Sequence, residues 1–216
     1  MKNIALIGAT GFVGSAILTE ALNRGFHVQG IVRNIEGINI KEKNFGALQA
    51  DVMDTDRLSE LLKGHDAVIS AYNPGWSNPN IYEDTLKGYR SILDAVKKAG
   101  IQRFQMVGGA GSLFVAPNVT LISSGKIPLK LRPGIESLAK VLTDYLLPEQ
   151  ELDWVFFSPA ANLSNGTRTG EYRLGKDDMI FDSRGESEIS VEDYAKAMID
   201  ELENPQHHRE RFTIGY

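Results

Sequence analysis

The chain has 216 residues, of which 42% are hydrophobic and 24% are charged, and these values are ordinary for a folded soluble domain. They exclude a disordered tail, a coiled coil and a collagen-like fibre, and the length suits one domain better than two. The formal net charge of −5 argues against broad affinity for nucleic acid or anionic membranes. Because cysteine is absent, disulfides, thiolate metal sites and cysteine nucleophiles are excluded.

The first residues carry no recognisable targeting signal. Glycine follows the short apolar run 4–7 at once, and no small-residue cleavage site comes after a longer apolar core. No apolar run approaches the roughly 18 residues of a membrane span. We therefore expect a cytoplasmic protein that has neither membrane nor nucleic-acid partners.

Strands and helices are expected to alternate along the first 158 residues. In chain order, the apolar spacing predicts a strand at 4–7, a helix at 12–24, strands at 27–32 and 47–50, a helix at 57–62, a strand at 67–70, a helix from 78 to 99, a strand at 104–107, a helix at 135–147 and a strand at 154–157. Such alternation predicts an α/β fold, a doubly wound parallel sheet with helices on both faces.

After residue 158, the regular alternation of strands and helices gives way to turns and short strand-like segments. A turn-rich loop at 165–170 is followed by short strand-like pieces at 171–174 and 179–181. A capping sequence at 190–193 precedes a helix over 194–202, and a last strand is expected near 212–214. Without repeats or linkers, we interpret 1–216 as a single domain, with 1–158 as the cofactor-binding core and 159–216 as a small substrate-side segment.

A glycine-spaced loop lies directly between the first strand and the first helix, and it reads Gly8-Ala9-Thr10-Gly11-Phe12-Val13-Gly14. In this position Gly8 permits a tight turn, Gly11 lets the backbone approach a pyrophosphate, and Gly14 lets the helix pack close to the strand. The amino end of the helix then faces the phosphates. We expect Gly8, Thr10, Gly11, Phe12, Val13 and Gly14 to bind a dinucleotide. A tight turn without a ligand is the alternative.

The end of the second strand indicates which dinucleotide is bound. An acidic residue here would accept hydrogen bonds from the ribose of NAD, whereas this chain has Arg33. A guanidinium suits a 2′-phosphate, so NADP is expected, with NAD as the alternative. A solvated arginine at a strand end would look the same in sequence.

Further candidate ligands follow the later strands, at the edge where open α/β sheets bind. For the cofactor they are Asp51, Val52, Ser70, Ala71, Tyr72, Gly108, Gly109 and Pro159, and for the substrate they are Asn73, Trp76, Ser112, Arg168 and Tyr172. The small residues of the stretch 108–111 would leave room for a bulky ring. Loop caps, packing aromatics and solvated side chains are the alternatives at these positions.

With these motifs the chain resembles the atypical short-chain dehydrogenases/reductases of the NmrA-like group, especially the small NADH-flavin reductases, which are often labelled NAD-dependent epimerase/dehydratase. The resemblance covers essentially the whole chain, through residues 8–14, 107–113, 158–161, 168–175 and 211–216. It implies an NAD(P)-binding Rossmann-type fold with a doubly wound parallel sheet, a nicotinamide cofactor, and flavin as a candidate substrate. Fold alone does not fix the substrate.

The Tyr-x-x-x-Lys pair that short-chain dehydrogenases usually carry is missing at its usual place. Tyr172 has a lysine four residues later, but this pair lies in a glycine-containing segment, where an extended chain separates such residues by roughly 13 Å. Tyr89 lies in an appropriate helix, yet Leu93 occupies the lysine position. Gly109 stands where a serine is expected, and Ser112 is the nearest hydroxyl. The catalytic residues stay unassigned, with Ser112 and Tyr172 as the only candidates.

These observations favour an NAD(P)H-dependent oxidoreductase that passes hydride directly to a flavin-like or quinone-like small molecule, because the cofactor and such an acceptor supply the chemistry. A non-catalytic NADP-sensing protein of NmrA type is the alternative, and a nucleotide-sugar epimerase or dehydratase fits least well. No metal is expected, since His207 and His208 lack a third ligand. The sequence leaves the oligomeric state open.

Overall fold

The computed structural model describes residues 3–36, 38 and 40–216. An eight-stranded sheet has the order β10-β12-β8-β5-β4-β1-β2-β3, and neighbouring strands are parallel except β10, which runs antiparallel to β12. These strands are β1 (Asn3–Ile7), β2 (His27–Val32), β3 (Phe45–Gln49), β4 (Ala67–Ser70), β5 (Arg103–Val107), β8 (Asp153–Ser158), β10 (Arg173–Gly175) and β12 (Glu210–Gly215).

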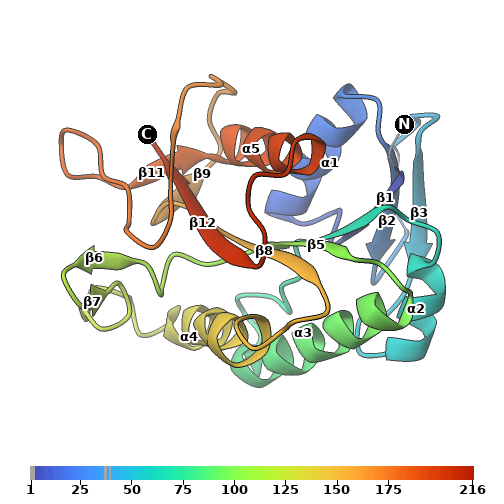
Figure 1. Cartoon of the computed structure of the whole chain (residues 1–216), viewed down its shortest axis with the longest axis horizontal. Coiled ribbons are helices and arrows are strands. Elements are labelled where there is room, and N and C mark those ends of the chain that lie inside the picture. Colours follow the sequence, from blue (N-terminus) through green and yellow to red (C-terminus); the bar gives the residue numbers. More distant parts are fainter. Residues whose placement is uncertain (1–2, 37, 39) are drawn as a thin grey trace.

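Helices cover both faces of the sheet (Figure 1). α1 (Phe12–Asn23) and α5 (Val191–Glu203) pack together on one face, whereas α2 (Thr55–Leu62), α3 (Ile81–Lys98) and α4 (Arg132–Val141) lie on the other. This is the doubly wound α/β arrangement of Rossmann type that the sequence predicts. Within the described part of the chain, no helix is both long and apolar enough to cross a membrane.

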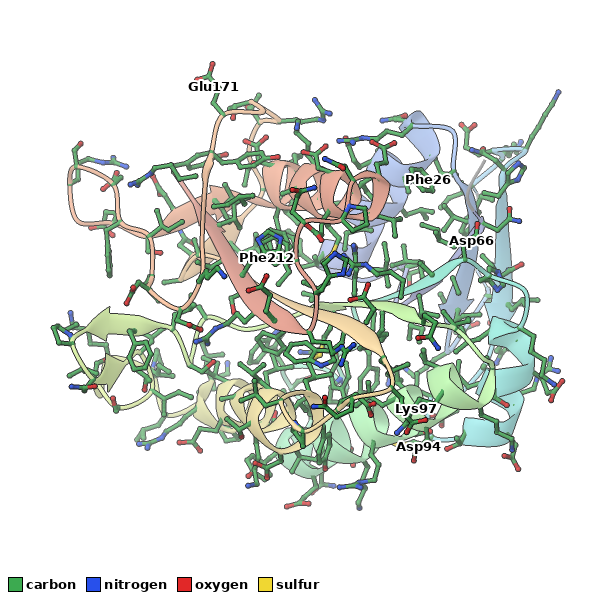
Figure 2. All side chains as sticks on the ribbon, viewed as in Figure 1. Phe26, Asp66, Asp94, Lys97, Glu171 and Phe212 are labelled. Atoms are coloured by element: carbon green, nitrogen blue, oxygen red, sulfur yellow. The ribbon has the colours of Figure 1, made fainter. Side chains whose placement is uncertain are left out.

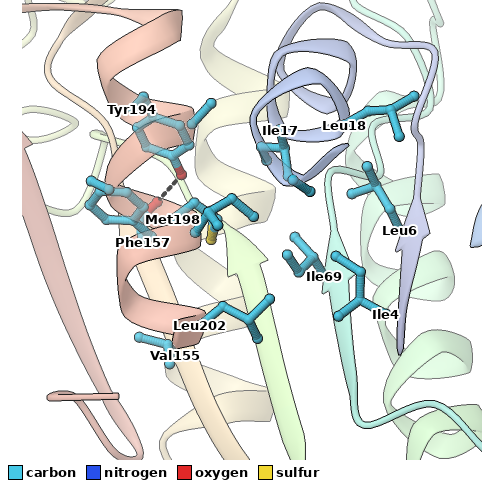
Figure 3. Packing of buried hydrophobic residues seen from close by; sticks show 14 of the residues in the cluster. Ile4, Leu6, Ile17, Leu18, Ile69, Val155, Phe157, Tyr194, Met198 and Leu202 are labelled. Carbon is cyan, nitrogen blue, oxygen red and sulfur yellow. Dashed lines mark hydrogen bonds between the residues drawn. The ribbon is translucent and has the colours of Figure 1, made fainter. Parts of the chain in front are cut away.

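The central strands contribute to two hydrophobic cores because successive side chains point to opposite faces. Ile4 and Leu6 of β1 face α1 and α5, while Ala5 and Ile7 face α2, α3 and α4. Figure 3 shows the first core, where Ile17 and Leu18 of α1 and Met198 and Leu202 of α5 pack over strand residues such as Ile69 and Val155. Burial on both faces explains why the central strands are almost wholly apolar.

The elements after residue 110 depart most from the sequence expectations. The helix expected at 135–147 is α4, which begins earlier, and it passes at Leu142–Leu146 into a π-helical turn. Residues 179–181 are not a strand. Asp178 forms only an isolated bridge to Phe114, and the preceding strand piece is β10. Two small sheets were missed, β6 (Phe114–Ala116) with β7 (Val119–Thr120) and β9 (Asn162–Ser164) with β11 (Glu188–Ser190). Two or three residues are too few to show a periodicity.

Two helices begin at a side-chain cap, and the second of these caps lies in the capping sequence predicted at 190–193. The Asp54 side chain accepts a hydrogen bond from the backbone N–H of Arg57 at 3.0 Å. Ser190 does the same for Asp193, also at 3.0 Å. Each cap satisfies a backbone donor that a helix leaves unpaired at its first turn.

Figure 2 shows which side chains are buried and which are exposed. Phe212 lies between the layers, whereas Glu171 projects from a loop into solvent.

A buried ion-pair cluster ties α5 to the amino end of the sheet. Arg103, at the start of β5, contacts the carboxylates of Glu201 in α5 at 2.6 Å and of Asp153 in β8 at 3.0 Å. It also donates to the backbone oxygen of His207. Only 9% of Arg103 and 5% of Glu201 is exposed, so removing one of the two would leave the other buried charge without its shortest ion-pair contact and with little access to water.

We predict that Arg103→Met lowers the free energy of unfolding by about 3 kcal/mol, because buried Glu201 would lose its arginine and keep, among the described residues, only the His207 ring and two backbone N–H groups as partners. Arg184→Met is the matched control, since Arg184 pairs with Asp182 on the surface and should cost less than about 1 kcal/mol. Denaturant unfolding followed by circular dichroism measures both variants. Equal losses would contradict a role for the buried cluster.

Candidate functional site

A cavity of about 820 Å³ opens at the carboxyl ends of the central parallel strands. The chain segments that follow β1, β2, β4, β5 and β8 all line it, together with part of α4. It lies across the point where the chain order reverses, since β4 and β2 flank β1 on opposite sides. Open α/β sheets bind ligands at this point, and the volume lies within the roughly 300–1,000 Å³ of small-molecule sites.

The glycine loop between β1 and α1 is closed by backbone contacts that exclude side chains. A Cβ on Gly14 would lie 2.0 Å from the carbonyl oxygen of Gly8, and one on Gly8 would lie 2.7 Å from the carbonyl oxygen of Ala71. Gly8 also has a φ of 80°, a conformation that favours glycine. These two glycines therefore shape the turn, and they do so before any ligand is considered.

Gly11 differs from the other two glycines because it leaves the amino end of α1 open. A Cβ there would meet only the Gly8 carbonyl oxygen, at 3.4 Å. No side chain caps α1, and no acidic residue lies in its first turn. Unpaired N–H groups and the positive end of the helix dipole therefore face the cavity, an arrangement that attracts phosphate.

Arg33 supplies the positive charge at the β2 side of the cavity. It is exposed, lines the cavity with its neighbour Asn34, and forms no ion pair or hydrogen bond with any residue that the structure describes. Since Arg33 lacks an internal partner, its guanidinium is available to an anionic ligand.

Tyr72 lines the cavity but is held away from acid–base chemistry. Its hydroxyl donates to the carbonyl oxygen of Asp84 at 3.1 Å, and its ring fits against Gly88, where a Cβ would come within 2.3 Å. Burial, followed by the nearby Asp84 carboxylate, raises the pKa of Tyr72 to about 12. Tyr89 is fully buried behind it and donates to the Tyr72 carbonyl oxygen. The phenol of Tyr72 therefore stays protonated and acts as a wall.

The glycines after β5 let neighbouring side chains pack closely against the backbone. A Cβ on Gly108 would lie 2.5 Å from the ring of Phe156, and one on Gly111 would lie 2.2 Å from Ile135. We expected small residues here to leave room for a bulky ring. Instead, their side-chain positions are occupied from within the protein, so these glycines let α4 approach the end of β5 and form the cavity wall with their backbone.

One end of the cavity has an apolar wall that the sequence did not reveal. Leu121, Leu131, Ile135 and Leu138 line it beside Trp76, which is 49% exposed. The spacing of residues 131, 135 and 138 indicates one face of a helix. Periodicity cannot tell a cavity wall from a packed core, because both require apolar side chains on that face.

The structure brings most of the expected ligands together. The cavity is lined by Gly8, Thr10, Gly11, Phe12, Val13, Arg33, Val52, Ala71, Tyr72, Asn73, Trp76, Gly108, Gly109 and Pro159. Their contacts with a cofactor or substrate remain predictions.

Four expected ligands lie beside the cavity or behind it. Gly14 is buried under the glycine loop, and Ser70 is fully buried within β4. The Asp51 side chain turns to its own loop and accepts from the N–H of Met53. Ser112 accepts from Arg211 of β12 at 2.8 Å. None of these side chains is among those that line the cavity.

Arg168 and Tyr172, which the sequence interpretation gave as substrate ligands, do not line the cavity. Arg168 binds Glu20 of α1 with two guanidinium nitrogens, each at 2.8 Å. Tyr172 donates to Asp200 of α5 at 2.7 Å. Both residues clamp a loop over the outer helices, away from the cavity lining. Of the segment 159–216, only residues 159–163 reach the lining.

The chemistry of the lining is restricted. Among the described residues that form it, Arg33 carries the only formal charge and Tyr72 the only phenol, while carboxylate, imidazole and amine groups are absent. The part of the chain that the structure describes also contains no cluster of three or more His, Asp or Glu placed to hold a metal ion. The site can bind an anion, a planar ring and apolar groups, but its side chains offer no proton donor for neutral pH.

Known proteins with similar sequences and structures share this architecture. Residues 8–205 match a family described as NAD(P)H-binding. The chain is 37% identical to the uncharacterized protein YwnB of Bacillus subtilis over 98% of this chain and 97% of that one. A crystal structure from Bacteroides thetaiotaomicron, of a "putative epimerase", superposes with a TM-score of 0.95 at 58% identity and covers 100% of this chain and 97% of its own. A "putative NADH-flavin reductase" from Streptococcus pneumoniae gives 0.85 at 32% identity and covers 100% and 99%.

The different roles of the loop glycines predict different effects of adding one methyl group. We expect Gly11→Ala to keep its melting temperature within about 2 °C but to weaken NADPH binding at least about tenfold, because the Cβ would stand between the backbone and the phosphates. Gly14→Ala should instead lower the melting temperature by roughly 5 °C or more, because its Cβ meets backbone. Thermal unfolding and nucleotide titration separate the two effects. Similar losses of stability in both variants would contradict this division.

Proposed function

This chain belongs to the NAD(P)H-binding family, within the atypical short-chain dehydrogenases/reductases of the NmrA-like group, and we propose that it reduces flavin-like or quinone-like acceptors with NADPH. Membership of the family supports the coarser statement, an NAD(P)H-dependent oxidoreductase. The observation that carries the finer proposal is the cavity itself, which combines a dinucleotide cradle with an apolar wall and lacks acid–base side chains.

The residues at the site fit an NADP-type dinucleotide. The open amino end of α1 and the backbone of the glycine loop suit the pyrophosphate, because they present N–H donors and no competing carboxylate. Arg33 suits a 2′-phosphate, since it carries a fixed positive fork that no internal partner occupies. The wall formed by Gly108, Gly109 and Pro159 lies at the β5 and β8 ends, where it would orient the nicotinamide.

The absence of a proton donor in the lining selects the kind of acceptor. Reduction of a carbonyl group to an alcohol requires a side chain that gives a proton to the oxygen, and epimerisation of a sugar requires one that moves a proton at the reacting carbon or oxygen. A flavin or quinone ring accepts hydride, and so two electrons, into its own π-system. NADPH would supply that hydride and leave as NADP⁺, while solvent supplies the remaining proton. The protein then needs only to bind and align the two rings, for which proximity is worth up to roughly 7–11 kcal/mol.

A dinucleotide sensor is the second candidate, because the same lining would also serve a protein that binds NADPH without turnover. Turnover separates the two functions. A protein that binds NADPH tightly but reduces no flavin or quinone above the uncatalysed rate would be a sensor, and the reductase proposal would be wrong.

We predict a flat pH profile for the reductase. With a quinone that has no ionisable substituent, kcat should change less than about twofold between about pH 6 and pH 9, because the raised pKa of Tyr72 keeps its phenol neutral throughout this range. Tyr72→Phe should retain at least about half of kcat for the same reason. A bell-shaped profile, or a loss of more than about tenfold in Tyr72→Phe, would reveal an acid–base group and contradict the proposed chemistry.

Arg33→Asp tests the choice of cofactor. We expect the Kd for NADPH to rise about 100-fold, because a charge-assisted contact is replaced by repulsion, while the Kd for NADH changes less than about threefold. Arg209→Asp is the matched control, since exposed Arg209 precedes β12 at the edge of the sheet opposite the cavity. Fluorescence titration with both nucleotides measures the effect. Equal losses for the two nucleotides would show that Arg33 does not read the 2′-phosphate.

A further inference from the structure

The wall at the acceptor end of the cavity comes from a stretch of chain without carboxylates. Residues 95–135 contain no Asp or Glu, although the chain has 28 acidic residues and a net charge of −5. This stretch supplies residues 107–111 together with Leu121, Leu131 and Ile135 of the cavity lining. This stretch, which would face the acceptor, therefore contributes no negative side chain, although the whole chain has a net negative charge.

Two lysines lie in the loop of this stretch that connects two residues of the cavity lining. The loop 122–130 connects Leu121 to Leu131, and both of these flanking residues line the cavity. The two ends of the loop therefore lie at the cavity wall. Lys126 and Lys130 of this loop are exposed and form no ion pair with any residue that the structure describes. Arg132, at the start of α4, is partly neutralised by Glu136 at 2.6 Å.

Two other loops that line the cavity carry no charge that could offset the two lysines, whereas Asp177 and Asp178 lie against β6 at Phe114, where Arg211 pairs with Asp177. Residues 71–80 and 159–167 contain no acidic or basic side chain. The first turn of α4, whose residues Leu131 and Ile135 line the cavity, holds no acidic residue either. The positive end of the α4 dipole adds to the field of the lysines rather than opposing it.

We propose that the acceptor is a planar ring that carries an anionic group, a phosphate or a carboxylate, and that Lys126 and Lys130 select it. This inference rests on the proposed function and names its substrate class. A bound NADPH is strongly anionic and would repel a second anion in the same cavity, so an anionic acceptor needs local positive charge to enter. The leucine-rich wall contacts the ring, while the two lysines meet the anionic group at the mouth, where charge steers association.

FMN and riboflavin test the proposal because they share the same ring and differ in one phosphate. Binding is measured on the protein saturated with NADP⁺, by quenching of flavin fluorescence, so the result does not depend on turnover. We expect FMN to bind about tenfold more tightly than riboflavin at low salt, and the difference to vanish near 0.5 M salt, where the Debye length is roughly 4 Å. Equal affinities at low salt would overturn the proposal.

The double variant Lys126→Glu/Lys130→Glu assigns the preference to the loop. It should weaken FMN binding about tenfold or more and change riboflavin and NADPH binding less than about twofold. The control Lys41→Glu/Lys43→Glu makes the same change in net charge in exposed residues that precede β3, at the opposite edge of the sheet. If the control loses as much FMN affinity, or if the loop variant loses riboflavin equally, the lysines do not select the acceptor.

Turnover with both flavins then separates this inference from the function on which it rests. A variant that loses kcat/KM for FMN about tenfold but keeps it for riboflavin supports both. Tighter binding of FMN without reduction of any flavin or quinone would contradict the reductase and leave an anion-selective binding site. Reduction of both flavins with equal kcat/KM would support the reductase and overturn the selection by Lys126 and Lys130.

Discussion

The close approach of α1 to the end of β1 is the constraint on which the rest of the site depends. Gly14 lies against the Gly8 carbonyl oxygen at a distance that leaves no room for a Cβ. The turn can therefore close only with glycine at both positions, and closure points the amino end of the helix across the edge of the sheet. The same turn packs against Ala71 at the end of β4, so the phosphate cradle and the topological switch point are fixed by one set of backbone contacts.

A polar clamp on the outer face holds α1 in this position. Glu20 of α1 accepts hydrogen bonds from both Arg24 and Arg168, and Arg24 also contacts Asp200 of α5 at 2.7 Å. Burial raises the pKa of Glu20, but the two guanidinium groups outweigh it and hold the pKa below its ordinary value. The clamp thus joins the two helices and the loop above them through charges that stay paired at neutral pH.

The residues that line the cavity and its adjoining loop determine which ligands it can bind. One side offers backbone donors and Arg33, and the other offers aliphatic side chains from α4, with Lys126 and Lys130 on the adjoining loop. None of these three cations forms an ion pair with a residue that the structure describes. Such a site uses charge and shape to bind and align ligands rather than side chains to transfer protons. The division explains how a short-chain dehydrogenase fold can lack the Tyr-x-x-x-Lys pair and still suit the hydride transfer proposed above.

The sequence by itself determined the central strands, the first helix and the place of the glycine loop between them. The apolar runs, the helical periodicity and the glycines at 8, 11 and 14 are local features, and they predicted the central strands, α1 and the position of the cradle. Arg33 could be placed at the cavity because its distance from a strand end is counted along the chain.

Only the tertiary structure decided which later residues face the cavity. Arg168 and Tyr172 are bound by Glu20 and Asp200, partners distant in sequence, so no local pattern could show that they turn outward. Leu131 and Ile135 have the same periodicity as core residues, and they line a cavity only because Gly111 lets α4 close over the end of β5 at that angle. Pattern fixes which face of an element is apolar, whereas packing decides whether that face meets protein or an open site.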